Sequence, residues 1–282
     1  PLKSEEFLKI EEGRIHNSEG ESEGGQLWRA ALLVEYQGTE YAGFQLQVGQ
    51  PTIQGELEKA LAKFTGQPIR IRAASRTDSG THAKGQVVDF LTSTQHPLEK
   101  FVLALNYHLP EDINVVEAHR VDDEFNSRRC ALSRTYRYSI LNRPAPSPLR
   151  RHSHYWIREN LDIETMAEAA QLLVGVHDFR ALAAGHPQDR SAVREVMQWE
   201  IEKFEDNIVI ECEATGFLKQ QIRKASGILT DIGRGRFPVN KVTQALAGDV
   251  SGTPLLPPHG LCLISVKYPS SIKIGLGNAG SE

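Results

Sequence analysis

The stretch PIRIRAASRTDSGTHAKGQVVDFLTS (residues 68–93) holds two strand patterns on either side of a polar loop. Residues 68–75 alternate between apolar and polar side chains, and residues 85–93 are rich in Val, Phe and Leu. Both patterns are typical of β-strands. The loop between them carries a single carboxylate, Asp78, two residues after Arg76. The patterns on both sides of this loop predict the fold, and the loop itself predicts the chemistry.

Helix and strand patterns around this stretch complete a ferredoxin-like unit. Residues 28–38 predict a strand, and residues 52–66 predict a helix that closes at Gly66. A second helix pattern at residues 97–110 and a strand pattern at residues 113–121 follow. The resulting order, β-α-β-β-α-β, is that of the split βαβ motif.

The second half of the chain repeats this order approximately. It reads as a strand, a helix, two paired strands, two helices and a final strand. The corresponding residues are 131–143, 161–175, 192–204, 207–216, 217–233, 240–248 and 260–268. These patterns predict an α+β protein of two similar ferredoxin-like lobes. We expect an N-terminal lobe at residues 29–125 and a C-terminal lobe at residues 126–269.

The ends of the chain are expected to lie outside these lobes. Residues 1–28 contain seven Glu and three basic residues around a Gly- and Ser-containing stretch, which predicts a disordered acidic arm. Residues 270–282 read as a flexible tail. The whole chain has a net charge of −4, so the arm accounts for the acidity and the body is neutral.

Composition excludes several classes of protein. Hydrophobic residues make up 40% of the 282 residues, as in ordinary globular proteins. No apolar run reaches the roughly 18 residues that a membrane span needs. The three cysteines are odd in number and far apart, which argues against a disulfide framework and a CxxC-type zinc site. A reducing cytoplasm is the simplest setting, and no metal site is expected because His82, His177 and Asp178 lack partners at ligand spacing.

Charge is unevenly distributed within the neutral body. The window from Phe125 to Arg158 contains eight arginines and no Asp or Glu, and tyrosines and a tryptophan lie among them. Such a run is often only a solvated face, but arginine forks bind phosphate and stack on bases, so this composition also indicates an RNA-binding surface. The candidate RNA contacts are Arg76, Arg128, Arg129, Arg134, Arg150 and Arg151.

Asp78 allows three interpretations. Asp-Ser-Gly is a common turn, in which the Asp side chain only stabilises the bend. The same letters occur in aspartic proteases, but a protease dyad needs a second such loop, and the chain has none. The third interpretation is a lone ionised carboxylate, held charged by arginine, that acts as a nucleophile or base on a nucleic acid.

Six blocks of the chain, in order, resemble the TruA-type tRNA pseudouridine synthases. The resemblance covers about residues 30–268. The blocks are EYQGTEYAGFQLQ (35–47), SRTDSGTHAKGQVVDF (75–90), FNSRRCALSRTYRYSILN (125–142), LLVGVHDFRAL (172–182), FLKQQIRKASGIL (217–229) and LPPHGLCLISVKY (256–268).

The resemblance implies the pseudouridine synthase fold, in which two lobes share a mostly antiparallel central sheet and the active-site cleft lies between them. It implies isomerisation of uridine to pseudouridine in the anticodon stem-loop of tRNA, at positions 38 to 40. It places the catalytic aspartate at Asp78, the active-site tyrosine at Tyr136 and the arginine that pairs with the aspartate at Arg223. Arg76 matches the arginine that displaces the target base. A homodimer bridged by tRNA is also implied.

This reaction involves no net oxidation and needs no energy source, so no cofactor is expected. The sequence carries no phosphate-binding loop for a nucleotide cofactor. The alternative from a different class is a non-catalytic RNA-binding protein or tRNA chaperone on the same scaffold. Conversion of uridine in unmodified tRNA, lost in Asp78→Asn, distinguishes the two.

Overall fold

The computed structural model describes residues 26–275, and the predicted acidic arm lies outside them except for its last three residues. Of these, Trp28 already belongs to the first strand. The predicted tail is described only to residue 275, and Ile274 is buried there. No helix among the described residues has the length and apolar character that a membrane crossing requires.

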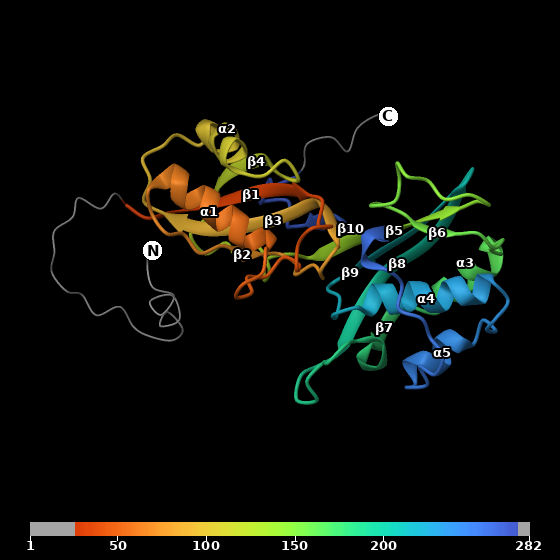
Figure 1. Cartoon of the computed structure of the whole chain (residues 1–282). Helices are drawn as coiled ribbons and strands as arrows, with labels where there is room; N and C mark the ends of the chain where they lie inside the picture. Colours follow the sequence, from red (N-terminus) through yellow and green to blue (C-terminus); the bar gives the residue numbers. More distant parts are fainter. Residues whose placement is uncertain (1–25, 276–282) are drawn as a thin grey trace.

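The first half folds as the sequence patterns predict, with two helices and four strands (Figure 1). The elements are β1 (Trp28–Tyr36), α1 (Ile53–Thr65), β2 (Arg72–Ala73), β3 (His82–Thr92), α2 (Glu99–His108) and β4 (Ile113–Val121). Helix α1 begins where the Thr52 side chain accepts a hydrogen bond from Gly55 N, and it ends at Gly66 in the left-handed conformation. Strand β1 pairs antiparallel with both β3 and β4.

Strand β2 is much shorter than the predicted strand at residues 68–75. At Ser75 the Gln86 side chain replaces a backbone partner, because Gln86 Oε1 accepts from Ser75 N and Gln86 Nε2 donates to Ser75 O. The backbone hydrogen bonds between β2 and β3 therefore end before Ser75. The chain is then free to turn into the loop that carries Asp78.

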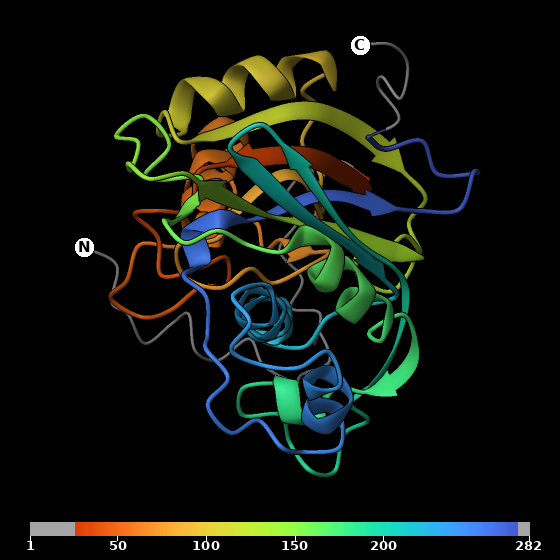
Figure 2. The same cartoon turned by 90° about the vertical axis from the view of Figure 1, so that its right-hand side faces the viewer.

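The second half contains the remaining strands and helices. The elements are β5 (Ser133–Asn142), β6 (Tyr155–Ile157), α3 (Ile163–Gln171), β7 (Gly175–Asp178), η2 (Arg180–Leu182), β8 (Val193–Phe204), β9 (Asn207–Ala214), α4 (Gln221–Gly233), α5 (Lys241–Leu246), η3 (Pro258–Gly260) and β10 (Leu261–Lys267). Helices α3, α4 and α5 lie together on one side of β8 and β9 (Figure 2). The predicted helix at residues 161–175 ends at Gln171, because Gly175, at φ 107°, turns the chain into β7.

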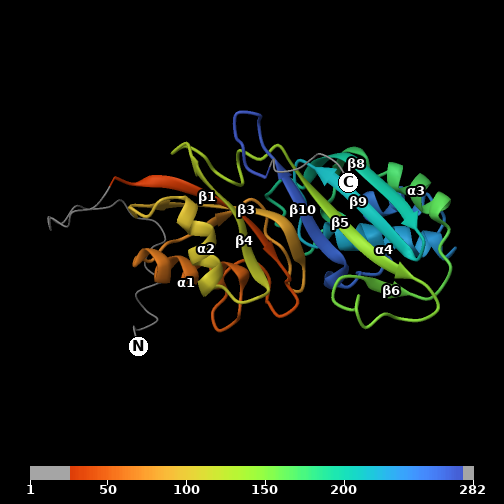
Figure 3. The ribbon, with the colours of Figure 1, turned by 90° about the horizontal axis from the view of Figure 1, so that it is seen from above.

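One sheet of ten strands runs through both halves, in the order β4-β1-β3-β10-β5-β9-β8-β7, with β2 on β3 and β6 on β5. By sequence β10 belongs to the second lobe, but it lies between β3 and β5 (Figure 3). It pairs antiparallel with β5 and, over a short register at Cys262 and Leu263, parallel with β3. The predicted α+β fold with a shared, mostly antiparallel sheet is confirmed.

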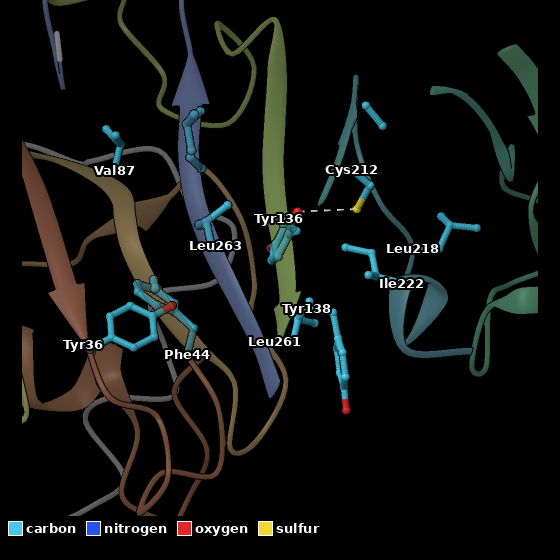
Figure 4. Packing of buried hydrophobic residues seen from close by; sticks show 14 of the residues in the cluster. Tyr36, Phe44, Val87, Tyr136, Tyr138, Cys212, Leu218, Ile222, Leu261 and Leu263 are labelled. Atoms are coloured by element: carbon cyan, nitrogen blue, oxygen red, sulfur yellow. Dashed lines mark hydrogen bonds between the residues drawn. The ribbon is translucent and has the colours of Figure 1, made fainter. Parts of the chain in front are cut away.

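The hydrophobic core is continuous across this junction. Leu261 and Leu263 of β10 lie between side chains of the first half, such as Tyr36, and side chains of the second half, such as Ile222 (Figure 4). Burying apolar side chains of the joining strand against both halves stabilises one lobe against the other. Groups carried by different halves can therefore keep a fixed geometry.

Candidate active site

The Asp78 loop (residues 74–81) connects β2 to β3 and is supported by the chain that follows β1. Phe44 N donates to Thr77 O at 3.1 Å, and Ser79 Oγ donates to Tyr41 O at 3.0 Å. Gly43 makes this approach possible, because a Cβ there would lie 2.9 Å from Thr77 O. The loop is thus held by hydrogen bonds on both sides of Asp78.

A buried polar network lies beneath the loop. Gln86 is completely buried, and its Nε2 donates to Ser75 O at 2.7 Å and to the Tyr36 hydroxyl at 3.4 Å. The Tyr36 hydroxyl is 2.8 Å from Thr77 Oγ1. Burial raises the pKa of Tyr36, so its hydroxyl stays protonated. Satisfied buried polar groups of this kind fix a loop in one conformation. Sequence reasoning did not find Gln86, although an isolated amide before a run of valines was its visible signal.

Asp78 faces an arginine from the other half of the chain. Arg223 Nη1 is 3.6 Å from Asp78 Oδ2, and the two side chains are 11% and 22% exposed. This distance is that of an ion pair rather than a direct hydrogen bond. Arg223 is itself oriented, because its Nε donates to Leu256 O at 2.7 Å. Helix α4 thus brings a positive charge to the carboxylate of the loop.

The segment at residues 254–260 connects Arg223 to the Asp78 loop. Besides Leu256 O, it offers Pro257 O to the Tyr138 hydroxyl at 2.8 Å. Pro258 lies against the loop, where a Cβ on Gly80 would be 2.9 Å from its ring. The same segment therefore touches both Arg223 and the loop that carries Asp78.

Gly227→Ala is expected to displace this segment. A Cβ on Gly227, one turn after Arg223 on α4, would lie 2.1 Å from Pro254 O. In an uncrowded helix the change would stabilise by about 1 kcal/mol. Here we expect the free energy of unfolding to fall by about 1–3 kcal/mol, measured by denaturant unfolding. A variant as stable as the wild type would contradict the close approach.

Tyr136 lies on β5 beside the loop and is only 4% exposed. Its hydroxyl is 2.8 Å from Ser75 Oγ, and its ring meets Phe217 edge to face at 5.5 Å. Burial raises the pKa of Tyr136, and the negative charge of Asp78 raises it further. The hydroxyl is therefore protonated at neutral pH and able to donate. The structure brings Asp78, Arg223 and Tyr136 together at the junction of the two halves.

His82, at the end of the loop, bridges two other segments. Its Nδ1 accepts from Gly38 N at 3.0 Å, so its Nε2, 3.0 Å from His259 O, carries the proton and donates. The bond that Nδ1 accepts requires the neutral ring, because both nitrogens of a charged ring are donors. Burial lowers the pKa of His82, as it lowers the pKa of His154 and His259.

Stability is expected to fall as the pH drops below about 6.5, the ordinary histidine pKa. His82 is neutral when folded and gains a proton first when unfolded, so the unfolded state binds more protons in this window. Melting temperatures measured between about pH 7.5 and about pH 5.5 should decline. In His82→Gln the amide can replace one bond but cannot titrate, so part of this decline should disappear. An identical decline in the variant would refute the role of His82.

The predicted RNA contacts occupy different environments. Arg76, Arg128 and Arg129 are exposed near the loop. Arg150 pairs with Asp206 at 3.1 Å, and exposed Arg151 donates to the neighbouring His152. These bonds show that Arg150 braces the turn between β8 and β9.

Arg134 is buried, and its guanidinium donates to four backbone carbonyls. This geometry favours a structural role for Arg134 over the predicted contact with RNA. Among residues 26–275, no three His, Cys, Asp or Glu side chains gather in a way that could hold a metal ion.

A family model of known proteins matches two segments of the chain. Residues 32–128 and 169–269 match the family model of tRNA pseudouridine synthases. The chain belongs to this family. The two matched segments of the family model include Asp78 and Arg223, whereas Tyr136 lies between them.

Several relatives are named tRNA pseudouridine synthase A. The relative from Myxococcus xanthus is 40% identical over 85% of this chain and 92% of its own length. The relative from Thermoanaerobacter sp. strain X514 is 42% identical over 84% of this chain and 98% of its own length. The relative from Roseiflexus castenholzii is 39% identical over 89% of this chain and 93% of its own length.

Proposed function

We propose that this protein converts uridine to pseudouridine in the anticodon stem-loop of tRNA, at positions 38 to 40. Membership of the tRNA pseudouridine synthase family gives the reaction class, an isomerisation of tRNA uridine. The observation that carries the proposal is the ion pair between Asp78 and Arg223 at 3.6 Å, in a partly exposed position. A carboxylate that only stabilised a turn would not need an arginine from a distant helix.

Asp78 acts at C1′ of the target ribose in this proposal. The C1′–N1 bond breaks, the uracil ring rotates, C5 bonds to C1′, the proton leaves C5 and N1 gains a proton. The positive charge that develops at C1′ is neutralised by the Asp78 carboxylate, as a nucleophile or an electrostatic partner. Arg223 faces that carboxylate as its ion-pair partner and fixes its direction.

Tyr136 supports the free base and moves its proton. The target uridine must leave its stack to reach Asp78, at a cost of a few kcal/mol. Stacking on an aromatic ring returns about 1–3 kcal/mol per base. The Tyr136 hydroxyl is protonated and lies next to Ser75 Oγ, so the two hydroxyls can pass a proton between C5 and the solvent.

The same proposal includes the partner and the setting. Two copies of the chain would form a homodimer that one tRNA bridges, and the protein would work in the cytoplasm. The free thiols of Cys130, Cys212 and Cys262 suit a reducing compartment.

The test is conversion of an unmodified tRNA transcript with uridine at positions 38, 39 and 40. Pseudouridine is mapped by a chemical adduct that stops reverse transcription, and transcripts with cytidine at each position serve as controls. We expect stops at positions 38 to 40 only. Conversion at other sites alone would refute the target, and binding without conversion of any tRNA would indicate an RNA chaperone.

A further inference from the structure

The buried guanidinium of Arg134 ties three segments together beside the Asp78 loop. Its Nη1 donates to Thr215 O at 2.8 Å and to Ala131 O at 3.3 Å. Its Nη2 donates to Ala74 O at 3.1 Å and to Arg128 O at 2.6 Å. Because the guanidinium is a rigid planar fork, it holds these carbonyls in a fixed arrangement.

Arg194 of β8 lies in the same region, because the residue after it is bonded to the end of β9. Thr215 N donates to Glu195 O at 3.0 Å, which holds the residue after Arg194 against the chain that Arg134 binds. The Arg194 side chain runs over Gly216, where a Cβ would lie 3.7 Å from its Nε. Arg194 is not in the arginine-rich window of the sequence.

Arg76 and Arg128 reach this place from the other two segments. Arg76 follows Ala74 by two residues, and Arg128 itself supplies one of the carbonyls that Arg134 binds. Partial loss of solvent lowers the pKa of Arg76 and of Arg194, and the positive charge of Arg128 lowers both further. Arg128 therefore lies within electrostatic range of each of the other two.

These three like charges have no salt bridge to a carboxylate anywhere in residues 26–275, unlike Arg223 with Asp78. Nearby like charges repel, so the arrangement costs free energy until an anion binds. Arg76 is two residues from Asp78, and Ser75, next to Arg76, contacts the Tyr136 hydroxyl. The cluster thus borders the place where the target nucleotide reacts.

We propose that Arg76, Arg128 and Arg194 together bind one backbone phosphate of the RNA beside the target uridine, and that Arg134 is the positioning residue that assembles them. The inference rests on the proposed function and specifies how the substrate is held. Guanidinium forks bind phosphate oxygens in pairs, so Arg128 and the two arginines within its electrostatic range suit a single phosphate. This anchor would keep the flipped nucleotide in register with Asp78.

The experiment measures the affinity of unmodified tRNA for Arg194→Ala and Arg128→Ala as a function of salt. Each variant should bind about tenfold more weakly at roughly 100 mM salt, and its slope of log K against log salt should be smaller by about 1. The single-turnover rate at saturating enzyme should also fall, because the anchor keeps the flipped nucleotide in register with Asp78. Arg137→Ala is the matched control, because Arg137 neighbours Tyr136 on β5 but is exposed and paired with Glu211. Its slope should match the wild type.

Arg134→Lys tests the positioning role. One ammonium cannot reach four carbonyls, so affinity and salt slope should fall as in Arg194→Ala. When Arg134→Lys is added to the Arg128→Ala/Arg194→Ala double variant, binding should weaken little further. If Arg134 had a purely structural role, the same substitution would weaken binding by the same factor in the double variant as in the wild type. If Arg194→Ala and Arg128→Ala keep the salt slope of Arg137→Ala, the proposed cluster is wrong. If the slopes fall but the wild type forms no pseudouridine, the cluster stands and the proposed function fails.

Discussion

Asp78→Asn should form pseudouridine more slowly than the wild type by roughly four orders of magnitude or more. Asparagine keeps the size and turn geometry of Asp78 but carries no negative charge, so it can neither attack C1′ nor neutralise the charge that develops there. The hydrogen bonds that hold the loop involve Thr77 O, Gly80 N and the Ser79 hydroxyl, so they are retained. We therefore expect tRNA affinity close to that of the wild type.

The measurement is single-turnover pseudouridine formation together with a binding isotherm for the same tRNA. Asp189→Asn is the matched control, because Asp189 is an exposed carboxylate in the loop before β8. It should convert tRNA at the wild-type rate. Conversion by Asp78→Asn within about tenfold of the wild type would exclude Asp78 as the reacting carboxylate.

Arg223→Met should lower the rate of conversion by roughly 10²–10³, the usual effect of removing one preorganised electrostatic partner. Methionine has a similar length and no charge, so Asp78 loses its ion pair and Leu256 O loses its donor. The unpaired carbonyl should also lower the free energy of unfolding by about 1–3 kcal/mol. Both the rate and the unfolding curve are measured.

Arg223→Lys separates charge from direction. Lysine keeps the positive charge but cannot bind Leu256 O and face Asp78 with one planar group, so its rate should lie between those of Arg223→Met and the wild type. Arg70→Met is the control, because Arg70 forms an exposed salt bridge with Glu58 and should lose at most about 1 kcal/mol and no activity. Full activity in Arg223→Met would remove the ion pair from the mechanism.

Most elements of the fold could be predicted because their signals are local. The alternation at β4, the capping Thr52 of α1 and the apolar spacing of α4 each lie within a few neighbouring residues. Strand β2 was overestimated, the helix before β7 was extended to Gly175, and β7 itself was not predicted. These errors arose where a buried side chain or a glycine conformation replaced the regular pattern.

The candidate site also contains residues with a local signal in the sequence and residues without one. Asp78 was visible because its loop has an unusual combination of carboxylate, arginine and glycine, and the resemblance to a family pointed to Tyr136 and Arg223. Gln86 and residues 256–260 lie in matching blocks, but neither source indicated their roles beside the loop, and neither indicated Arg194. Their roles depend on contacts between segments that are far apart in the chain.

The sequence alone therefore determined the order of helices and strands, the loop that carries the carboxylate and the family of the chain, since neighbouring residues encode all three. Tertiary structure decided that β10 joins the two halves, that Arg223 reaches Asp78, and that Arg134 is buried while Arg128 is exposed. An arginine looks the same in the sequence whether its guanidinium meets carbonyls or water. Only the packing of distant segments provides the carbonyls. Hydrogen bonds to these carbonyls offset the free-energy cost of burying the charge.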